Sequence, residues 1–221
     1  MGCSSGDSKV GMTDPPSRGR PSRTGPPATH DFDAIYASSV PPWDIGRPQP
    51  AFEELARSGG LAGKVLDVGC GTGEHALLAA TLGQETVGVD IAPRAIERAE
   101  AKAADRGLEV RFLVWDALRL PELGEQFDTV LDCGLFHILD DADRVRFVHG
   151  LAAVVPPDGR YHMLCFSDRQ PGEGGPRRIT QGEIRTSFAD GWDIDCIEPA
   201  MIQVTYDPSG VLAWHAAITR A

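Results

Sequence analysis

The sequence predicts an α/β domain built on a seven-stranded, doubly wound sheet, with a helical lid before the first strand. From residue 64 onward, strand-like and helix-like segments alternate, which is typical of a mostly parallel sheet with helices on both faces. Several of the helical segments stop at glycines such as Gly83 and Gly107, the residue that most often ends a helix. With 221 residues, 42% of them hydrophobic, the chain can bury one proper core.

The expected elements follow one another along the chain. The segments that read as strands are residues 64–69, 85–90, 109–116, 127–134, 160–168, 192–199 and 211–220. Those that read as helices are residues 31–38, 51–60, 74–83, 92–107, 141–155 and 180–188. Because only a turn around residues 207–210 joins the last two strands, one pair there is expected to be antiparallel.

The chain divides into a tail and one domain. Residues 1–30 are rich in Gly, Pro, Ser and Arg and have almost no large apolar side chain, so we expect a disordered tail. Residues 31–221 form the expected folded domain, of which residues 31–60 make up the lid segment. Its connector "PPWDIGRPQP" is too rich in proline for a helix or a central strand.

Composition excludes several classes of partner. The formal net charge of -11 would repel a nucleic-acid backbone. No apolar run reaches the roughly 18 residues that a membrane helix needs. The five cysteines are scattered, without a CxxC pair, so we expect neither a disulfide framework nor a metal site. A cytoplasmic protein, monomeric or weakly dimeric, is the expectation.

The stretch "VLDVGCGTGEH" (65–75) carries the first chemical signal. Its loop Gly69-Cys70-Gly71-Thr72-Gly73 follows a strand that contains Asp67, and ligands of open parallel sheets bind beyond the carboxyl ends of strands. The spacing is G-x-G-x-G, whereas the dinucleotide fingerprint is G-x-G-x-x-G. A carboxylate beside the loop would repel a pyrophosphate and suits a cationic ligand, such as one with an ammonium group.

Two further strands end in carboxylates. Asp90 ends the second strand, 23 residues after Asp67, where a carboxylate can accept from two ribose hydroxyls. Asp116 ends the third and could accept from an exocyclic amine. A ligand with an ammonium group, a ribose and an adenine but no phosphate is S-adenosyl-L-methionine. The alternatives are that Asp90 caps the following helix and that Asp116 caps a turn.

Residues 64–166 resemble the class I S-adenosylmethionine-dependent methyltransferases, whose sheet is Rossmann-like. The motifs are "VLDVGCGTGEH", "TVGVDIAPRAIERA", "LVWDALRLP" and "FDTVLDCGLFHIL". The resemblance implies that Asp67 and residues Gly69, Cys70, Gly71, Thr72 and Gly73 bind the methionine part, Asp90 the ribose, Ile91 the adenine, and Asp116 with Ala117 its amine, while Cys133 lines the site. Cys70 and Cys133 could also be small core residues.

The segment "YASSVPPWDIGRPQPAF" (36–52) resembles the lid of the thiopurine, halide and thiol methyltransferases. In those enzymes a tryptophan followed by a glycine and a buried aromatic residue folds over the cofactor, and the corresponding residues here are Trp43, Gly46 and Phe52. A connector with a core tryptophan is the alternative. The candidate acceptor-binding residues are Tyr36, Trp43, Phe136, His137, Phe166 and Trp214. His137 is the candidate general base, or a partly buried histidine without that role.

The expected activity is methyl transfer to a small aromatic or heterocyclic acceptor at an O, N or S atom, without a metal. Three alternatives stay open at this point: a halide or thiol methyltransferase, a protein that binds S-adenosylmethionine without catalysis, and, against the loop spacing, a nicotinamide oxidoreductase. The stretch "LCFSDRQPGEGGPRRIT" (164–180) reads as a flap after the fifth strand or as a flexible loop.

Overall fold

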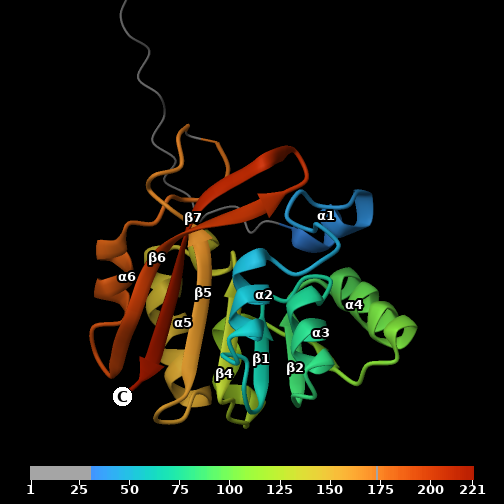
Figure 1. The fold of residues 1–221 in the computed structure, drawn as a ribbon, viewed down its shortest axis with the longest axis horizontal. Helices are drawn as coiled ribbons and strands as arrows, with labels where there is room; N and C mark the ends of the chain where they lie inside the picture. Colours follow the sequence, from blue (N-terminus) through green and yellow to red (C-terminus); the bar gives the residue numbers. More distant parts are fainter. Residues whose placement is uncertain (1–30, 173) are drawn as a thin grey trace, which may run out of the picture.

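The computed structural model describes residues 31–172 and 174–221, and the expected tail 1–30 lies outside them. Within the described residues, seven strands form one sheet in the order β3-β2-β1-β4-β5-β7-β6 (Figure 1). The strands are β1 (Val65–Val68), β2 (Thr86–Asp90), β3 (Arg111–Val114), β4 (Thr129–Cys133), β5 (Arg160–Phe166), β6 (Trp192–Val204) and β7 (Asp207–Arg220). The first five are parallel, and β7 runs antiparallel to both β5 and β6. The expected doubly wound, seven-stranded sheet is confirmed.

The last hairpin differs from the sequence prediction. Residues 207–210 were expected to form its turn, but they lie inside β7, and the chain reverses between Val204 and Asp207, which pair with each other. The end of the β6–β7 hairpin extends beyond the other strands (Figure 1). Pro208 and Ser209 are exposed there, so the polar sequence "DPSG" does not prevent pairing.

Local signals in the sequence explain where the helices begin and end. The helices are α1 (Phe32–Ser38), α2 (Pro50–Arg57), α3 (Glu74–Thr81), α4 (Pro93–Arg106), α5 (Asp141–Val154) and α6 (Gln181–Ser187), with the 3₁₀ segments η1 (Ala117–Leu123) and η2 (Phe136–Ile138). The Asp31 and Asp140 side chains cap α1 and α5, and Thr180 with Glu183 forms a capping box on α6. Gly107 ends α4 at φ 63°. None of these helices of the described chain is long and apolar enough to cross a membrane.

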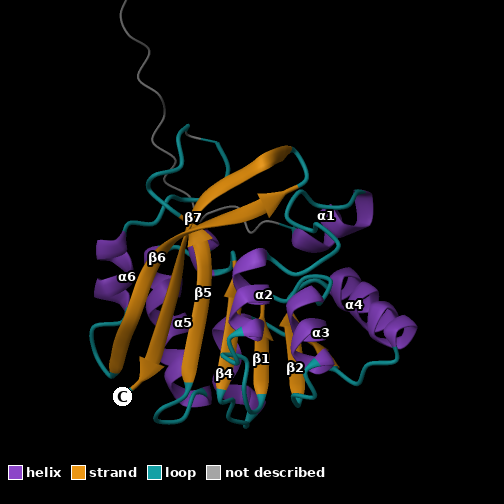
Figure 2. Cartoon of the chain, in the orientation of Figure 1, coloured by secondary structure: helices purple, strands orange, loops and turns teal. Residues whose placement is uncertain are grey.

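The sheet separates two apolar layers because alternate residues of a strand face opposite sides. Leu66 and Val68 of β1 belong to the layer that contains Phe147 and Leu151 of α5. Val65, on the other face, belongs to the layer with Phe52 of α2. Figure 2 shows α2 and α3 in front of the sheet and α5 behind it. The carboxyl ends of β1, β2, β4 and β5 therefore meet at one edge, which the lid and the last hairpin approach.

Two histidines contact Phe52 in the layer beneath α2, and a third stacks on one of them. The Phe52 ring centroid lies 4.8 Å from that of His75 and 6.2 Å from that of His215, and His162 stacks on His215 at 5.7 Å. Both ring nitrogens of His162 and Nε2 of His215 are buried without a hydrogen-bond partner among the described residues. Burial lowers the pKa of His75 to about 4 and that of His162 to about 3, so these rings are neutral at physiological pH.

Candidate functional site

The loop after β1 presents bare backbone at the carboxyl edge of the sheet. Gly69, Gly71 and Gly73 have φ of 69°, 53° and 85°, a region that side-chain-bearing residues rarely adopt. The Cys70 amide donates to the Val89 carbonyl of β2 at 2.9 Å, which ties the loop to the neighbouring strand. A ligand can therefore approach the loop backbone closely.

Two carboxylates from β1 and β2 accept hydrogen bonds from the loop and from the segments next to it. Asp90, at the end of β2, accepts hydrogen bonds from the Gly71 amide at 2.8 Å and from the Ala92 amide at 2.9 Å. Asp67 in β1 accepts from the Ala76 amide with Oδ2 at 3.1 Å. Its other oxygen, Oδ1, is buried and has no partner among the described residues. A buried acceptor atom without a donor is costly, so Asp67 suits a ligand that brings a donor or a positive charge.

The electrostatics of the loop favour a cation. Burial raises the pKa of Asp67 to about 7 and the pKa of Asp132 in β4 to about 6, and it raises the pKa of Asp90 above its ordinary value. Desolvated carboxylates next to one another disfavour their own ionised forms. A positively charged ligand at this edge would relieve that cost.

The lid covers the glycine loop with two aromatic side chains. The Trp43 indole Nε1 donates to the Tyr36 hydroxyl at 3.1 Å, and Tyr36 is buried. The Tyr36 hydroxyl oxygen lies 2.8 Å from the position that a Cβ on Gly71 would take. Tyr36, expected at the acceptor, thus lies over the loop that carries the cofactor motif.

Charged residues of α4 and α3 hold the lid in this position. The Thr72 hydroxyl donates to Asp44 Oδ2 at 3.0 Å and receives a hydrogen bond from the Lys102 ammonium at 2.7 Å. Lys102 also pairs with Glu74 at 2.8 Å, and Arg106 pairs with the same carboxylate. Sequence reasoning did not single out these anchors. One signal was available, because Arg94, Arg98, Lys102 and Arg106 recur every four residues along one face of α4.

The other side of the lid is fixed to the last hairpin. Gln49 is buried and exchanges two hydrogen bonds with the Gln203 backbone, at 3.0 and 2.8 Å. The Thr205 amide donates to the Pro42 carbonyl at 2.9 Å. The Gln49 amide donates to Nε2 of His75 in α3 at 3.2 Å. The lid segment is therefore held by both halves of the chain.

The residues expected near the adenine lie at the ends of β2 and β3. Ile91 is 57% exposed just beyond Asp90, so its side chain is accessible to a ligand. Asp116 caps η1 by accepting from the Leu118 amide at 2.9 Å, as its alternative interpretation expected. The Trp115 amide donates to the Asp90 carbonyl at 2.8 Å, which brings Asp116 and Ala117 to the same edge.

A second group of residues lies at the ends of β4 and β5. Cys133 ends β4, and the Gly134 amide that follows donates to the Leu164 carbonyl at 2.9 Å. His137 is buried, and its ring meets the Phe166 ring edge-on at 4.8 Å. A Cβ on Gly69 would stand 3.3 Å from Leu135, so this group adjoins the glycine loop.

Phe136 follows the end of β4 and Trp214 pairs with Cys165 near the end of β5, but both side chains are buried in the core. Phe136 is fully buried and stacks on Phe188 of the core at 6.0 Å. Trp214 is also a core residue, and its indole donates to the Ile179 carbonyl at 3.0 Å and to Asp168 at 3.1 Å. Both aromatics occupy the apolar interior because their faces of η2 and β7 point into it, which the sequence spacing alone did not reveal.

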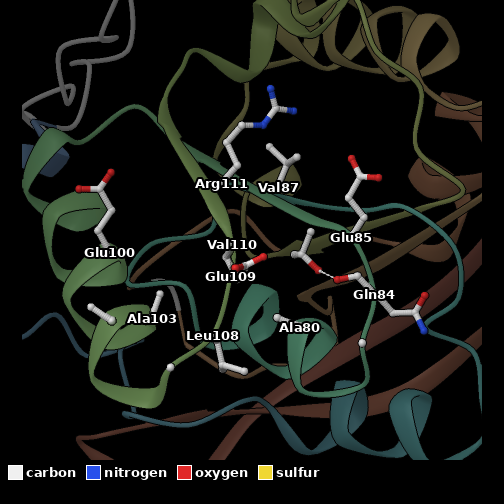
Figure 3. A pocket seen from close by; sticks show the side chains of 14 residues that line it. Ala80, Gln84, Glu85, Val87, Glu100, Ala103, Leu108, Glu109, Val110 and Arg111 are labelled. Atoms are coloured by element: carbon white, nitrogen blue, oxygen red, sulfur yellow. Dashed lines mark hydrogen bonds between the residues drawn. The ribbon is translucent and has the colours of Figure 1, made fainter.

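One cavity lies at the opposite end of the sheet from the glycine loop. It measures about 1070 Å³ and is lined by residues before and at the starts of β2 and β3, including Gln84, Glu85, Glu109 and Arg111 (Figure 3). Those residues are at the amino ends of the strands, opposite the glycine loop. Ligands of this sheet type bind at carboxyl ends, so we assign the site to the loop and not to this cavity.

Comparisons with known proteins show which family the chain resembles. Residues 65–159 match the family described as a methyltransferase domain. The chain is 35% identical to the 2-heptyl-1-hydroxyquinolin-4(1H)-one methyltransferase of Mycobacteroides abscessus, over 76% of this chain and 75% of that one. It is 27% identical to the probable thiol methyltransferase 2 of Arabidopsis thaliana, over 69% and 68% of the two chains. A structure described as "Conversion of a Disulfide Bond into a Thioacetal Group during Echinomycin Biosynthesis" is 37% identical, covers 86% of this chain and 91% of its own, and has a TM-score of 0.79.

Proposed function

Because the chain belongs to the class I S-adenosylmethionine-dependent methyltransferases, we propose that it methylates a small aromatic or heterocyclic acceptor at an oxygen, nitrogen or sulfur atom. The cofactor is S-adenosyl-L-methionine. The relative named for a hydroxyquinolinone supports a heteroaromatic acceptor.

One observation carries the proposal: the glycine loop lies above a buried carboxylate oxygen that has no partner among the described residues. Asp67 Oδ1 suits the positively charged methionine end of the cofactor, and the backbone at Gly69 and Gly71 leaves room for it. Asp90 would hold the ribose in addition to the two amides that it already accepts from. Ile91 and Asp116 would contact the adenine. The carboxylates and the loop backbone at this edge therefore match the ammonium, ribose and adenine groups of the cofactor.

The cofactor supplies an activated methyl group on its sulfonium. What remains for the chain is to align an acceptor with that methyl group and to keep water out, and alignment alone can supply about 7–11 kcal/mol of the barrier. Tyr36 and Trp43 close the cofactor side of the site. Gly134, His137 and Phe166 border the acceptor side.

A thiol is the second acceptor class that we consider. The relative named as a probable thiol methyltransferase supports it, and a thiolate needs no strong base near neutral pH. Aromatic thiols belong to both acceptor classes.

The experiment is transfer of a labelled methyl group from S-adenosyl-L-methionine to a panel of hydroxylated quinolines, phenols, aromatic thiols and iodide. We expect turnover of the heteroaromatic hydroxyl and thiol compounds and little of iodide. Asp90→Ala should weaken cofactor binding by about 1.5–3 kcal/mol, the range for hydrogen bonds to a charged group. Tight cofactor binding without transfer to any panel member would favour the non-catalytic alternative.

A further inference from the structure

A hydrogen bond that His137 accepts fixes the position of its proton. The backbone amide of Phe166 donates to His137 Nδ1 at 3.0 Å in a buried contact. In a neutral imidazole, the nitrogen that accepts cannot carry the proton, so the hydrogen is on Nε2. Burial, together with the charges of Arg144 and Arg178, lowers the pKa of His137 to about 3. The ring is therefore neutral, and its outer nitrogen is a donor.

Nε2 lies where an acceptor would meet the sheet edge. It is 3.4 Å from the position of a Cβ on Gly134, the residue that follows β4. No hydrogen bond joins Nε2 to any residue that the structure describes. A general base needs a free lone pair at this atom, and in this tautomer Nε2 has none to offer.

Two guanidinium groups pack against the aromatic rings next to His137, that of Arg144 on Phe136 and that of Arg178 on Phe166. Arg144 of α5 is buried, and its Nη2 has no partner in the described part of the chain, while Nη1 is 3.3 Å from Glu183. The Arg178 guanidinium lies 5.6 Å from the Phe166 ring centroid. Its four hydrogen bonds go to the backbone carbonyls of Gln170, Pro171, Gly172 and Pro176, and it forms no ion pair with a described residue.

The carboxylate at the end of β4 already has its hydrogen-bond partners. Asp132 of β4 accepts from the Leu135 amide at 2.8 Å, the Phe136 amide at 3.1 Å and the Tyr161 hydroxyl at 2.7 Å. Both of its oxygens are satisfied, so it is not free to take a proton from an acceptor. Among the described residues, the acceptor side of the site thus combines donors and positive charge, and neither His137 nor Asp132 is free to act as a base.

We propose that the acceptor binds as its anion and that His137 Nε2–H donates a hydrogen bond to it. This inference rests on the proposed function and narrows it to weak acids that ionise near neutral pH, such as N-hydroxy heteroaromatics, electron-poor phenols and aromatic thiols. A lone pair of the anion forms the bond to the methyl carbon, and the electron pair of the broken carbon–sulfur bond stays on sulfur. The negative and positive charges cancel, and no proton moves during the step.

The ionisation state of the bound acceptor can be measured without turnover. We would titrate 4-nitrophenol and 4-nitrothiophenol with the full-length protein saturated with S-adenosylhomocysteine, and follow the visible absorption of each anion against pH. The bound compounds should ionise at a pH about one unit lower than in solution, which corresponds to tenfold tighter binding of the anion. Binding of the neutral forms only, or of neither compound, would overturn the proposal.

Two substitutions separate a donor from a base. In His137→Gln the amide nitrogen can take the place of Nε2, whereas His137→Asn keeps an oxygen for the Phe166 amide but places no donor at Nε2. We expect kcat/KM within about tenfold of wild type for glutamine and a loss of about 10- to 100-fold for asparagine. Equal losses, with a pH limb that vanishes in both variants, would assign the histidine as a base. Wild-type transfer to neutral acceptors only would overturn this inference and leave the proposed function intact.

Discussion

Asp67 is the residue whose protonation state should change most when the cofactor binds. Its carboxyl is buried in β1, with one oxygen unpartnered among the described residues and a pKa raised to about 7 by desolvation. A neighbouring positive charge favours the ionised form of a carboxyl group. Binding of a cationic ligand and loss of a proton from Asp67 are therefore linked.

We expect the affinity for S-adenosyl-L-methionine to rise between about pH 6 and pH 8, by up to tenfold per unit below the pKa of Asp67. The raised pKa sets this sign, because the free protein holds a proton at pH 6 that the complex must lose. Calorimetry in two buffers of different ionisation enthalpy would count the released protons. Asp67→Asn should remove the pH dependence and Asp116→Asn should keep it. A wild-type affinity that is flat over this range would contradict the linkage.

The Tyr36 side chain packs so closely on Gly71 that there is no room for a side chain at position 71. A methyl group on Gly71 would stand 2.8 Å from the Tyr36 hydroxyl oxygen, and the backbone there has φ 53°. We expect Gly71→Ala to weaken cofactor binding at least tenfold, partly through the clash and partly through strain of about 1 kcal/mol.

The clash can be isolated with a double-mutant cycle. Tyr36→Phe removes the hydroxyl, so the double variant should bind the cofactor more tightly than the sum of the two single losses predicts. Dissociation constants from calorimetry give the coupling. Strictly additive losses would mean that Tyr36 and Gly71 act separately.

The first part of the lid, residues 31–49, has few apolar contacts to the main core, whereas α2 packs Phe52 into it. Phe32 and Trp43 meet edge-on at 6.2 Å, and polar bonds of Asp44 and Gln49 attach the segment to its neighbours. Elements held by few buried apolar contacts open most readily, and lids commonly control access to an active site.

Trp43→Ala should therefore lower turnover more than stability. We expect kcat/KM to fall about tenfold or more and the melting temperature to change by only about 2–4 °C, because the side chain is 42% exposed. Val40→Ala, at an exposed apolar position of the same segment, is the matched control and should change neither value. If Trp43→Ala and Val40→Ala behaved alike, Trp43 would have no special role in the lid.

The sequence predicted elements with strong periodicity and missed those without it. The helices and the parallel strands follow from apolar spacing and glycine stops. The 3₁₀ segment η1 contains Pro121 and has no regular pattern, and residues 207–210 looked like a turn. The glycine loop could be found because its residues are contiguous. The basic face of α4 was visible in the sequence, but its partners in the lid were not. Asp44 and Lys102 lie about 30 residues from Thr72 on either side, and only the fold brings them together.

At the scale of the whole molecule, buried histidines make stability depend on pH. His75, His137 and His162 are held neutral with pKa values of about 4, 3 and 3, and the pKa of His215 is also lowered. The unfolded chain binds protons at these residues below about pH 6.5, whereas the folded chain does not. The free energy of unfolding is therefore not reduced by these histidines above that pH, and it decreases as the pH falls below it. The raised pKa values of Asp67 and Asp132 act in the opposite direction over the same range.

His162→Leu isolates the contribution of one histidine to the pH dependence of stability. Neither ring nitrogen of His162 has a partner among the described residues, so an apolar replacement should cost little at pH 7. Urea unfolding measures the free energy of unfolding at each pH. From pH 7 to pH 5 this free energy should fall by about 2 kcal/mol less in the variant than in the wild type. His149→Gln, on the exposed side of α5, is the control and should follow wild type. A variant with the unchanged pH dependence would show that His162 is protonated in the folded state.

The bonds between the lid and the last hairpin impose an order on biosynthesis. Gln49 is held by Gln203, and Pro42 by Thr205, across more than 150 residues of chain. During translation the lid segment is made before Gln203 and Thr205, so these bonds can form only after the last hairpin has been synthesised. We expect nascent chains arrested before residue 200 to bind S-adenosyl-L-methionine at least tenfold more weakly than the released protein, so that incomplete products do not sequester the methyl donor.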